Sequence, residues 1–148
     1  MLNEFASTTY PSTYFSKAID YDGGEYGIAT ASKYELTDAK TVNVDSTGAT
    51  EQRVYQRMVF KKGNYEIAFY NTHLSYETEA IRKKQMEELK TAIQNDSTPY
   101  IIVTGDFNAD QHRSEFNLFL EELDMVNGYQ GKWYDTFNGV DETMKVNS

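Results

Sequence analysis

The change of hydrophobic period between residues 54 and 103 constrains the fold more than any other feature of this sequence. Apolar and polar residues alternate from Val54 to Phe60, and the turn Lys62-Gly63-Asn64 leads into a second run that ends at Asn71. This pattern predicts a β-hairpin. Helical spacing follows from Glu77 to Gln94, and Tyr100-Ile101-Ile102-Val103 is then wholly apolar, as in a buried central strand. A strand, a helix and a strand in series predict a crossover unit with parallel strands.

The segments on either side of this unit are more polar. A strand from Thr13 to Ile19, a turn at Asp22-Gly23-Gly24 and a strand from Tyr26 to Ala31 are predicted upstream. The polar segment from Thr37 to Thr50 is expected to be a surface excursion. Downstream, Ser114 is expected to cap a second helix. The apolar residues of that helix are Phe116, Phe119, Leu120 and Leu123.

Length and charge narrow the classes of protein further. The 148 residues suffice for one domain, spanning 1–148, and no stretch is apolar for long enough to cross a membrane. The net charge of −9 argues against tight binding of long duplexes, because nucleic-acid binders usually carry a basic field. Cysteine is absent, which excludes disulfides and thiolate zinc sites but leaves the compartment open. A monomer is expected; a cytoplasmic location is slightly favoured for the chain, with secretion open for a longer protein.

Two polar clusters stand where consecutive predicted strands end. Asn71-Thr72-His73-Leu74 follows one strand and Gly105-Asp106-Phe107-Asn108 follows the next. If the strands are parallel neighbours, both clusters lie on the rim where ligand sites gather. A carboxylate can hold a divalent metal or orient water, an amide can bind a phosphate or a metal-bound oxygen, and an imidazole can donate to a phosphoryl oxygen. Gly105 would permit a tight turn, with Phe107 anchoring the loop in the core.

A structural interpretation of the same residues is also available. Asp and Asn favour turns, so Asp-Phe-Asn after a strand is most often a plain turn when it occurs alone. Thr-His-Leu alone is likewise more often structural. The two clusters together, joined by one amphipathic helix, favour a functional site formed by His73, Asp106 and Asn108. His112 lies in a polar stretch and is interpreted as a surface residue.

With these motifs in place, the sequence resembles the endonuclease/exonuclease/phosphatase family, also called deoxyribonuclease I-like. The Asn-Thr-His-Leu and Gly-Asp-Phe-Asn pair is the most specific part of the resemblance. The other matching pieces are residues 24–33, 53–60, Arg82-Lys83-Lys84-Gln85 and Asp135-Thr136-Phe137-Asn138-Gly139.

The resemblance implies a mixed α/β fold, namely the deoxyribonuclease I-like four-layer sandwich of two β-sheets flanked by helices. It implies that His73 contacts and activates a phosphate, that Asp106 orients the nucleophilic water, and that Asn108 helps to hold phosphate or metal. Asp106 and Asn108 are the metal-ligand candidates, and Mg²⁺ or Mn²⁺ is the expected cofactor. The substrate would be a phosphorylated small molecule or a nucleic acid, hydrolysed at a phosphodiester or phosphomonoester bond.

Two motifs of the family do not occur in this sequence. Family members carry a Gln-Glu pair whose Glu is the main metal ligand, and a Ser-Asp-His motif whose His is essential for hydrolysis. The expectation is therefore a truncated sandwich, a partial family domain that is inactive in isolation. Two alternatives stay open: a non-catalytic module that retains the fold, and an unrelated α/β binding domain in which both clusters are turns.

Overall fold

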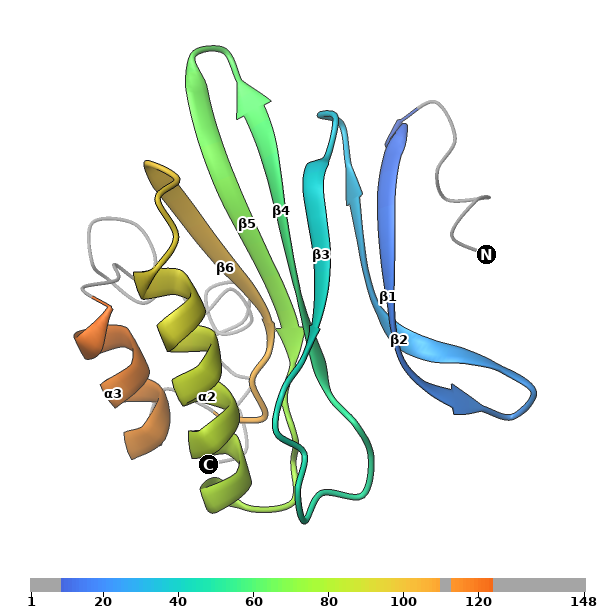
Figure 1. The fold of residues 1–148 in the computed structure, drawn as a ribbon, viewed down its shortest axis with the longest axis vertical. Coiled ribbons are helices and arrows are strands. Elements are labelled where there is room, and N and C mark those ends of the chain that lie inside the picture. Colours follow the sequence, from blue (N-terminus) through green and yellow to red (C-terminus); the bar gives the residue numbers. More distant parts are fainter. Residues whose placement is uncertain (1–8, 110–112, 124–148) are drawn as a thin grey trace, which may run out of the picture.

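The computed structural model describes residues 9–109 and 113–123 as two β-sheets and two helices. Strands β1 (Ser12–Tyr21) and β2 (Gly24–Ser32) form an antiparallel hairpin. The second sheet has the order β3-β4-β5-β6, and its strands are β3 (Thr37–Asn43), β4 (Val54–Lys62), β5 (Tyr65–His73) and β6 (Tyr100–Asp106). Figure 1 shows α2 (Glu79–Gln94) and α3 (Ser114–Glu122) on one face of this sheet and the hairpin of β1 and β2 on the other.

This layering is the mixed α/β arrangement of two sheets with outer helices that the resemblance implied. Successive side chains of a strand point to opposite sides, so the four-stranded sheet has two faces. One face packs against the helices and the other against the β1–β2 hairpin (Figure 1). Among the described residues, the helical layer covers the four-stranded sheet only.

The hairpin of β4 and β5 follows the predicted pattern. Lys62 pairs with Tyr65 across a two-residue turn, and Gly63 has a φ of +60°, which glycine adopts without strain. Tyr55 packs in the core cluster beneath the helices, whereas Gln56 bonds to the backbone of the β1–β2 hairpin. The side chains from Val54 to Phe60 therefore alternate between the two faces of β4, as the sequence predicted. Tyr55 lies on the helix side and Gln56 on the hairpin side.

The crossover from β5 through α2 to β6 is also confirmed. Thr78 caps α2 by accepting a hydrogen bond from the backbone N–H of Ile81 at 3.3 Å, and Asn95 ends the helix before Pro99. Strands β5 and β6 are parallel neighbours. A parallel pair needs such a crossover, and the helix supplies it.

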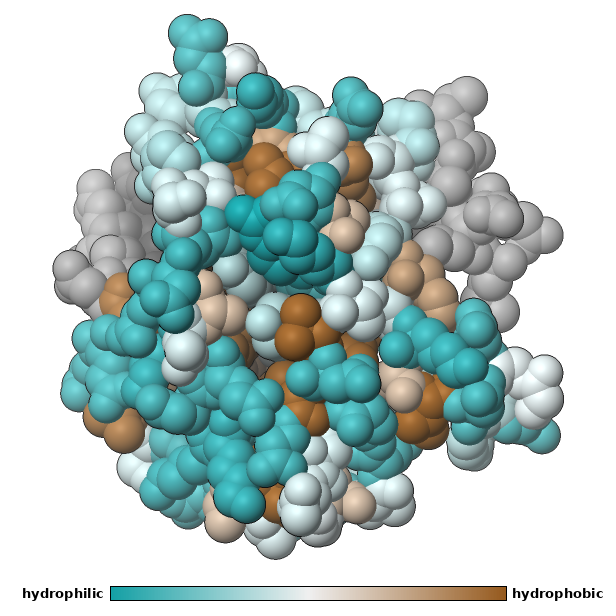
Figure 2. Space-filling model, viewed as in Figure 1, coloured by the Kyte–Doolittle hydropathy of each residue, from teal (hydrophilic) through white to brown (hydrophobic). Residues whose placement is uncertain are grey.

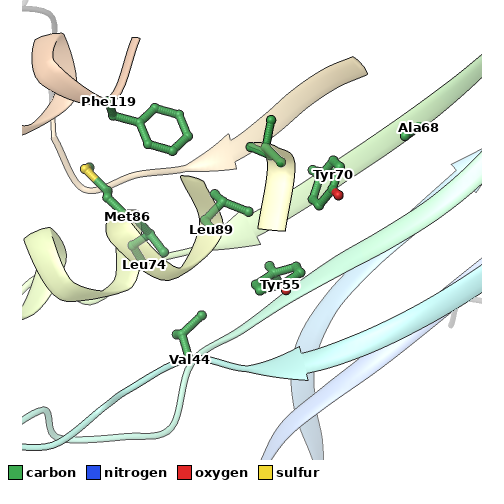
Figure 3. Packing of buried hydrophobic residues seen from close by; sticks show 9 residues of the cluster. Val44, Tyr55, Ala68, Tyr70, Leu74, Met86, Leu89 and Phe119 are labelled. Atoms are coloured by element: carbon green, nitrogen blue, oxygen red, sulfur yellow. The ribbon is translucent and has the colours of Figure 1, made fainter. Parts of the chain in front are cut away.

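The main core lies between α2, α3 and the four-stranded sheet, as Figure 3 shows. Leu74, Ala68 and Leu89 are fully inaccessible to solvent, and Phe119 of α3 closes the cluster from the far side. The other buried members are Val44, Tyr55, Tyr70, Met86 and Ile93. Burial of apolar surface at about 25 cal/mol per Å² makes this cluster the principal source of stability.

A buried amide joins the β1–β2 hairpin to the sheet. Gln56 has no exposed surface; its Nε2 donates to the carbonyls of Tyr14 (3.1 Å) and Ile28 (3.0 Å). Its Oε1 accepts from Thr30 Oγ1 at 2.8 Å and from Asn71 Nδ2 at 3.2 Å. All four hydrogen-bonding positions of the amide are used, so its burial carries no unpaired polar atom.

The structure corrects three sequence predictions. The start of the segment from Thr37 to Thr50 is not a surface excursion: residues 37–43 form β3, an edge strand of the sheet whose residues are mostly exposed and can therefore be polar. Strand β6 is not central among the described residues but lies at the sheet edge, with Ile102 exposed on the face away from the helices. Ser114 is the first residue of α3 rather than its cap, which is Arg113 without a side-chain bond.

The exposed surface is mostly hydrophilic. Figure 2 shows one face on which hydrophobic residues are scattered in small groups, the usual pattern for a folded domain. No helix within residues 9–109 and 113–123 is both long and apolar enough to span a membrane.

Candidate active site

The parallel register of β5 and β6 brings the two predicted clusters together. His73 and Asp106 are direct register partners at the ends of their strands, and His73 Nε2 lies 3.8 Å from Asp106 Oδ2. The imidazole is largely buried, with 27% of its side chain exposed, whereas the Asp106 carboxylate is 66% exposed. The carboxylate can therefore reach a ligand from solvent while the imidazole is held in place.

The turn after β6 explains how Asp106 is presented. Asp106 Oδ1 accepts a hydrogen bond from the backbone N–H of Asn108 at 2.9 Å, and Asn108 has a φ of +48°. Asn108 Nδ2 donates to the carbonyl of Leu74 at 2.8 Å, and the Leu74 N–H donates to the carbonyl of Asp106 at 2.9 Å. These bonds form the turn that the structural interpretation expected. Asp106 Oδ2 and Asn108 Oδ1 take part in none of them.

Phe107 anchors this turn, as predicted. Its ring packs against Phe116 and Phe119 of α3, with centroids 5.2 and 5.6 Å apart. Such tilted and edge-on pairs are favourable aromatic contacts. The loop that carries Asp106 is thus held by the core on one side and by Leu74 on the other.

Gly105 is required by the close approach of β5. Its φ is +139°, and a Cβ at this position would lie 2.1 Å from the carbonyl oxygen of Thr72.

We expect Gly105→Ala to destabilise the protein by about 3 kcal/mol, because backbone strain adds to a steric overlap with a buried strand. Chemical denaturation would measure this loss. Gly63→Ala is the matched control, since its positive φ is strained but nothing lies within 4 Å of the added Cβ; equal losses in the two variants would contradict the overlap.

The loop after β5 is fixed by a buried glutamine of α2. Gln85 has no exposed surface; its Oε1 accepts from the N–H of Ser75 at 2.9 Å, and its Nε2 donates to Ser75 Oγ and to the carbonyl of Asp45. Arg82, also buried, donates to Glu115 of α3 and to the carbonyl of Tyr76. These two residues are buried, while Lys83, Lys84, Glu87 and Glu88 form the solvated face of α2.

Arg53 and Glu51 also lie beside His73, although the sequence did not single them out as site residues. Arg53 NH1 is 3.2 Å from His73 Nδ1, and Arg53 NH2 is 2.8 Å from Glu51 Oε1. The hairpin register does not predict this contact: Tyr55 pairs with Thr72, and continuing the pairing would place Arg53 opposite Leu74 rather than on the face of His73.

Burial and the positive charge of Arg53 lower the pKa of His73 below its ordinary value of 6.5. The carboxylates of Asp106 and Glu51 oppose this shift. The net effect is a lowered pKa, which favours a neutral His73 imidazole at pH 7.

The oxygen atoms at this rim could supply some, but not all, of the ligands of a divalent cation. Asp106 and Asn108 offer one carboxylate and one amide oxygen, which are hard ligands of the kind that Mg²⁺ prefers. Within the described parts of the chain, no group of three or more His, Cys, Asp or Glu side chains is arranged to hold a metal. Two oxygens are too few for the near-octahedral demand of Mg²⁺. His112 and the matching segment 135–139 lie outside the described residues.

The comparisons with known proteins assign the family. A sequence model of the Endonuclease/Exonuclease/phosphatase family matches residues 2–144, so the chain belongs to this family. No curated protein sequence matches it significantly.

Among solved structures, a sphingomyelinase C from Streptomyces griseocarneus is 17% identical with a TM-score of 0.64, covering 83% of this chain and 51% of its own. A β toxin from Staphylococcus aureus with bound magnesium ions is 20% identical with a TM-score of 0.59, covering 86% and 52%. The human Nocturnin catalytic domain with a bound sulfate anion is 18% identical with a TM-score of 0.61, covering 80% and 50%.

These likenesses establish the deoxyribonuclease I-like fold. The chain spans about half the length of each of these three structures.

Proposed function

We propose that this chain forms part of a divalent-metal-dependent hydrolase of phosphate esters, with its reaction centre at the rim of β5 and β6. The observation that carries the proposal is the pairing of His73 with Asp106 at the carboxyl ends of two parallel strands, in a chain that belongs to this family. The same edge is where ligands bind in sheets with crossover connections.

The roles follow from the chemistry of the two side chains. Asp106 is exposed and has one oxygen free of the turn, so it orients the attacking water or shares in holding the cation. His73 is held by its neighbours and donates a hydrogen bond to the phosphoryl oxygen that gains charge. Asn108 contributes its amide oxygen to the phosphate or cation. Mg²⁺ or Mn²⁺, held by Asp106 and Asn108, would polarise the phosphoryl group and neutralise charge on the leaving oxygen.

The relatives support this assignment. The β toxin carries magnesium ions and Nocturnin carries a sulfate, an anion of the same tetrahedral shape as phosphate. The net charge of −9 favours a small phosphorylated substrate over long duplexes, because a strongly acidic surface repels a polyanion.

A non-catalytic module is the second candidate function. It is favoured by one observation: within the described residues, no group of three or more His, Cys, Asp or Glu side chains is arranged to hold a metal. We propose that the remaining ligands belong to a longer domain, in keeping with the coverage of about half of each related structure. The coding sequence on both sides would distinguish the two candidates, since an upstream Gln-Glu and a downstream Ser-Asp-His would complete the family's site.

Turnover tests the proposed activity. The chain would be expressed together with the segments encoded on both sides of it. This longer protein would be incubated with a chromogenic phosphodiester or phosphomonoester and Mg²⁺ or Mn²⁺. Hydrolysis of either ester that stops on addition of a chelator is expected. A folded protein that hydrolyses neither would favour the non-catalytic module.

We expect the 148-residue chain alone to bind Mg²⁺ weakly or not at all, because two protein oxygens leave most of the coordination shell to water. Isothermal titration calorimetry at low ionic strength would measure the affinity, and Asp106→Ala is the control for any weak heat. Tight stoichiometric binding would show that the chain already holds the principal metal ligand.

A further inference from the structure

The two ring nitrogens of His73 face different partners. Nδ1 lies 3.2 Å from NH1 of Arg53, and Nε2 lies 3.8 Å from Oδ2 of Asp106. Arg53 is almost completely buried, with 3% of the residue exposed. The imidazole is therefore held between an internal cation and an external carboxylate.

The chemistry of the guanidinium decides where the imidazole proton resides. A guanidinium has five N–H donors and no acceptor, and it stays charged at any pH that leaves the protein folded. Its hydrogen bond to Nδ1 requires a lone pair on Nδ1. A neutral imidazole has one N–H, so the proton must then be on Nε2.

We propose that Arg53 is a positioning residue that fixes His73 as its Nε2–H tautomer and directs this single N–H toward the side of the rim where Asp106 lies. The tautomer follows from the contact alone. Its catalytic consequence rests on the proposed function: neutral His73 presents a donor to a phosphoryl oxygen and has no lone pair on Nε2 with which to accept a proton.

Arg53 is itself well anchored. Its NH2 pairs with Glu51 at 2.8 Å, its backbone N–H donates to Ser46 Oγ at 3.0 Å, and its carbonyl accepts from the N–H of Val44 at 3.1 Å. A buried guanidinium tied at the side chain and at both backbone groups can hold the ring rather than follow it.

Nitrogen NMR of the imidazole tests the tautomer directly. The sequence contains two histidines, so His112→Gln leaves His73 as the only signal. In the ¹⁵N-histidine-labelled chain at alkaline pH, we expect Nε2 to show the shift of a protonated nitrogen and Nδ1 that of an unprotonated one. A protonated Nδ1, or the averaged mixture of free histidine, would overturn the proposal.

Asp106 favours the same tautomer, so its influence must be removed. In the His112→Gln/Asp106→Ala chain, the Nε2–H signal should persist because Arg53 remains. Adding Arg53→Met, which keeps a long side chain but removes the donor, should produce the mixture, and Arg53→Lys should restore the single tautomer. A pure Nε2–H signal in the Arg53→Met variant would show that Arg53 does not position the ring.

Circular dichroism would establish that each variant is folded. Should Arg53→Met fail to fold, the spectra of the two Arg53-containing chains still decide whether the Nε2–H tautomer exists with and without Asp106. None of these spectra depends on hydrolysis. A missing activity and a wrong tautomer are therefore separate results.

Discussion

The 148-residue chain by itself is expected to hydrolyse phosphodiesters and phosphomonoesters no faster than background. A metal, a water-orienting carboxylate and imidazoles act in such sites as one unit, so the loss of one member removes most of the rate. The described residues supply His73, Asp106 and Asn108, and the sequence contains neither the Gln-Glu nor the Ser-Asp-His motif of the family. These three residues can orient a phosphate but cannot offset its charge.

A chromogenic assay with Mg²⁺ or Mn²⁺, with and without chelator, measures this prediction. The protein extended at both ends is the positive control and should regain chelator-sensitive turnover. Robust chelator-sensitive turnover by the 148-residue chain would mean that the catalytic centre has been placed on the wrong residues.

A large loss of stability is also expected from a change at Asp96, far from the rim. Its carboxylate, 5% exposed, accepts from Arg57 Nε (3.0 Å) and NH2 (3.1 Å) and from the hydroxyl of Tyr70 (2.7 Å). Arg57 also pairs with Asp38 on β3, so the network joins the end of α2 to three strands of the sheet. We expect Asp96→Ala to lower the free energy of unfolding by about 3 kcal/mol, because it leaves a largely buried guanidinium with too few partners.

This contribution should depend on pH in a defined direction. Burial alone would raise the pKa of Asp96, but hydrogen bonds from Arg57, Thr98 and Tyr70 lower it well below the ordinary value of 3.8. A carboxyl whose pKa is depressed by folding stabilises the protein above its unfolded pKa and loses this effect as the pH falls toward the folded pKa. The difference between the parent and Asp96→Asn should therefore be full at pH 6 and shrink below about pH 4.

Urea denaturation of the parent, Asp96→Ala and Asp96→Asn at several pH values would measure both effects. Asp20→Ala is the control, since that carboxylate is 80% exposed and pairs only at the surface with Lys17. A loss for Asp96→Ala no larger than that of the control would contradict the role of the buried network.

Period and turn chemistry sufficed to predict the central unit from the sequence. The turn at Gly63-Asn64 and the helix from residue 79 to 94 specify which strands are neighbours, and this in turn predicts that His73 and Asp106 share a rim. The local sequence pattern was less informative for segments whose structure is determined by tertiary contacts. Strand β3 is recognisable only through its pairing with β4, since its polar residues have no strong preference of their own.

The contacts of His73 show the same limit. The imidazole and its carboxylate partner were predicted from their positions at strand ends. The guanidinium of Arg53 was not, because an arginine at the start of a strand ordinarily faces solvent. The register of β4 and β5 does not place it there either, because neighbouring residues of a strand point to opposite faces; the contact forms where the regular pairing ends.

The most direct test of the proposed centre is the initial rate of phosphodiester hydrolysis by the extended protein and its Asp106→Ala and His73→Ala variants. Glu66→Ala is the matched control, an exposed carboxylate near the start of β5 that pairs at the surface with Lys61. Removal of either rim side chain should reduce kcat by about 10³-fold or more in a protein that remains folded by circular dichroism, while the control stays within about threefold of the parent. Rates of Asp106→Ala and His73→Ala that match the control would contradict the assignment of the reaction to this rim.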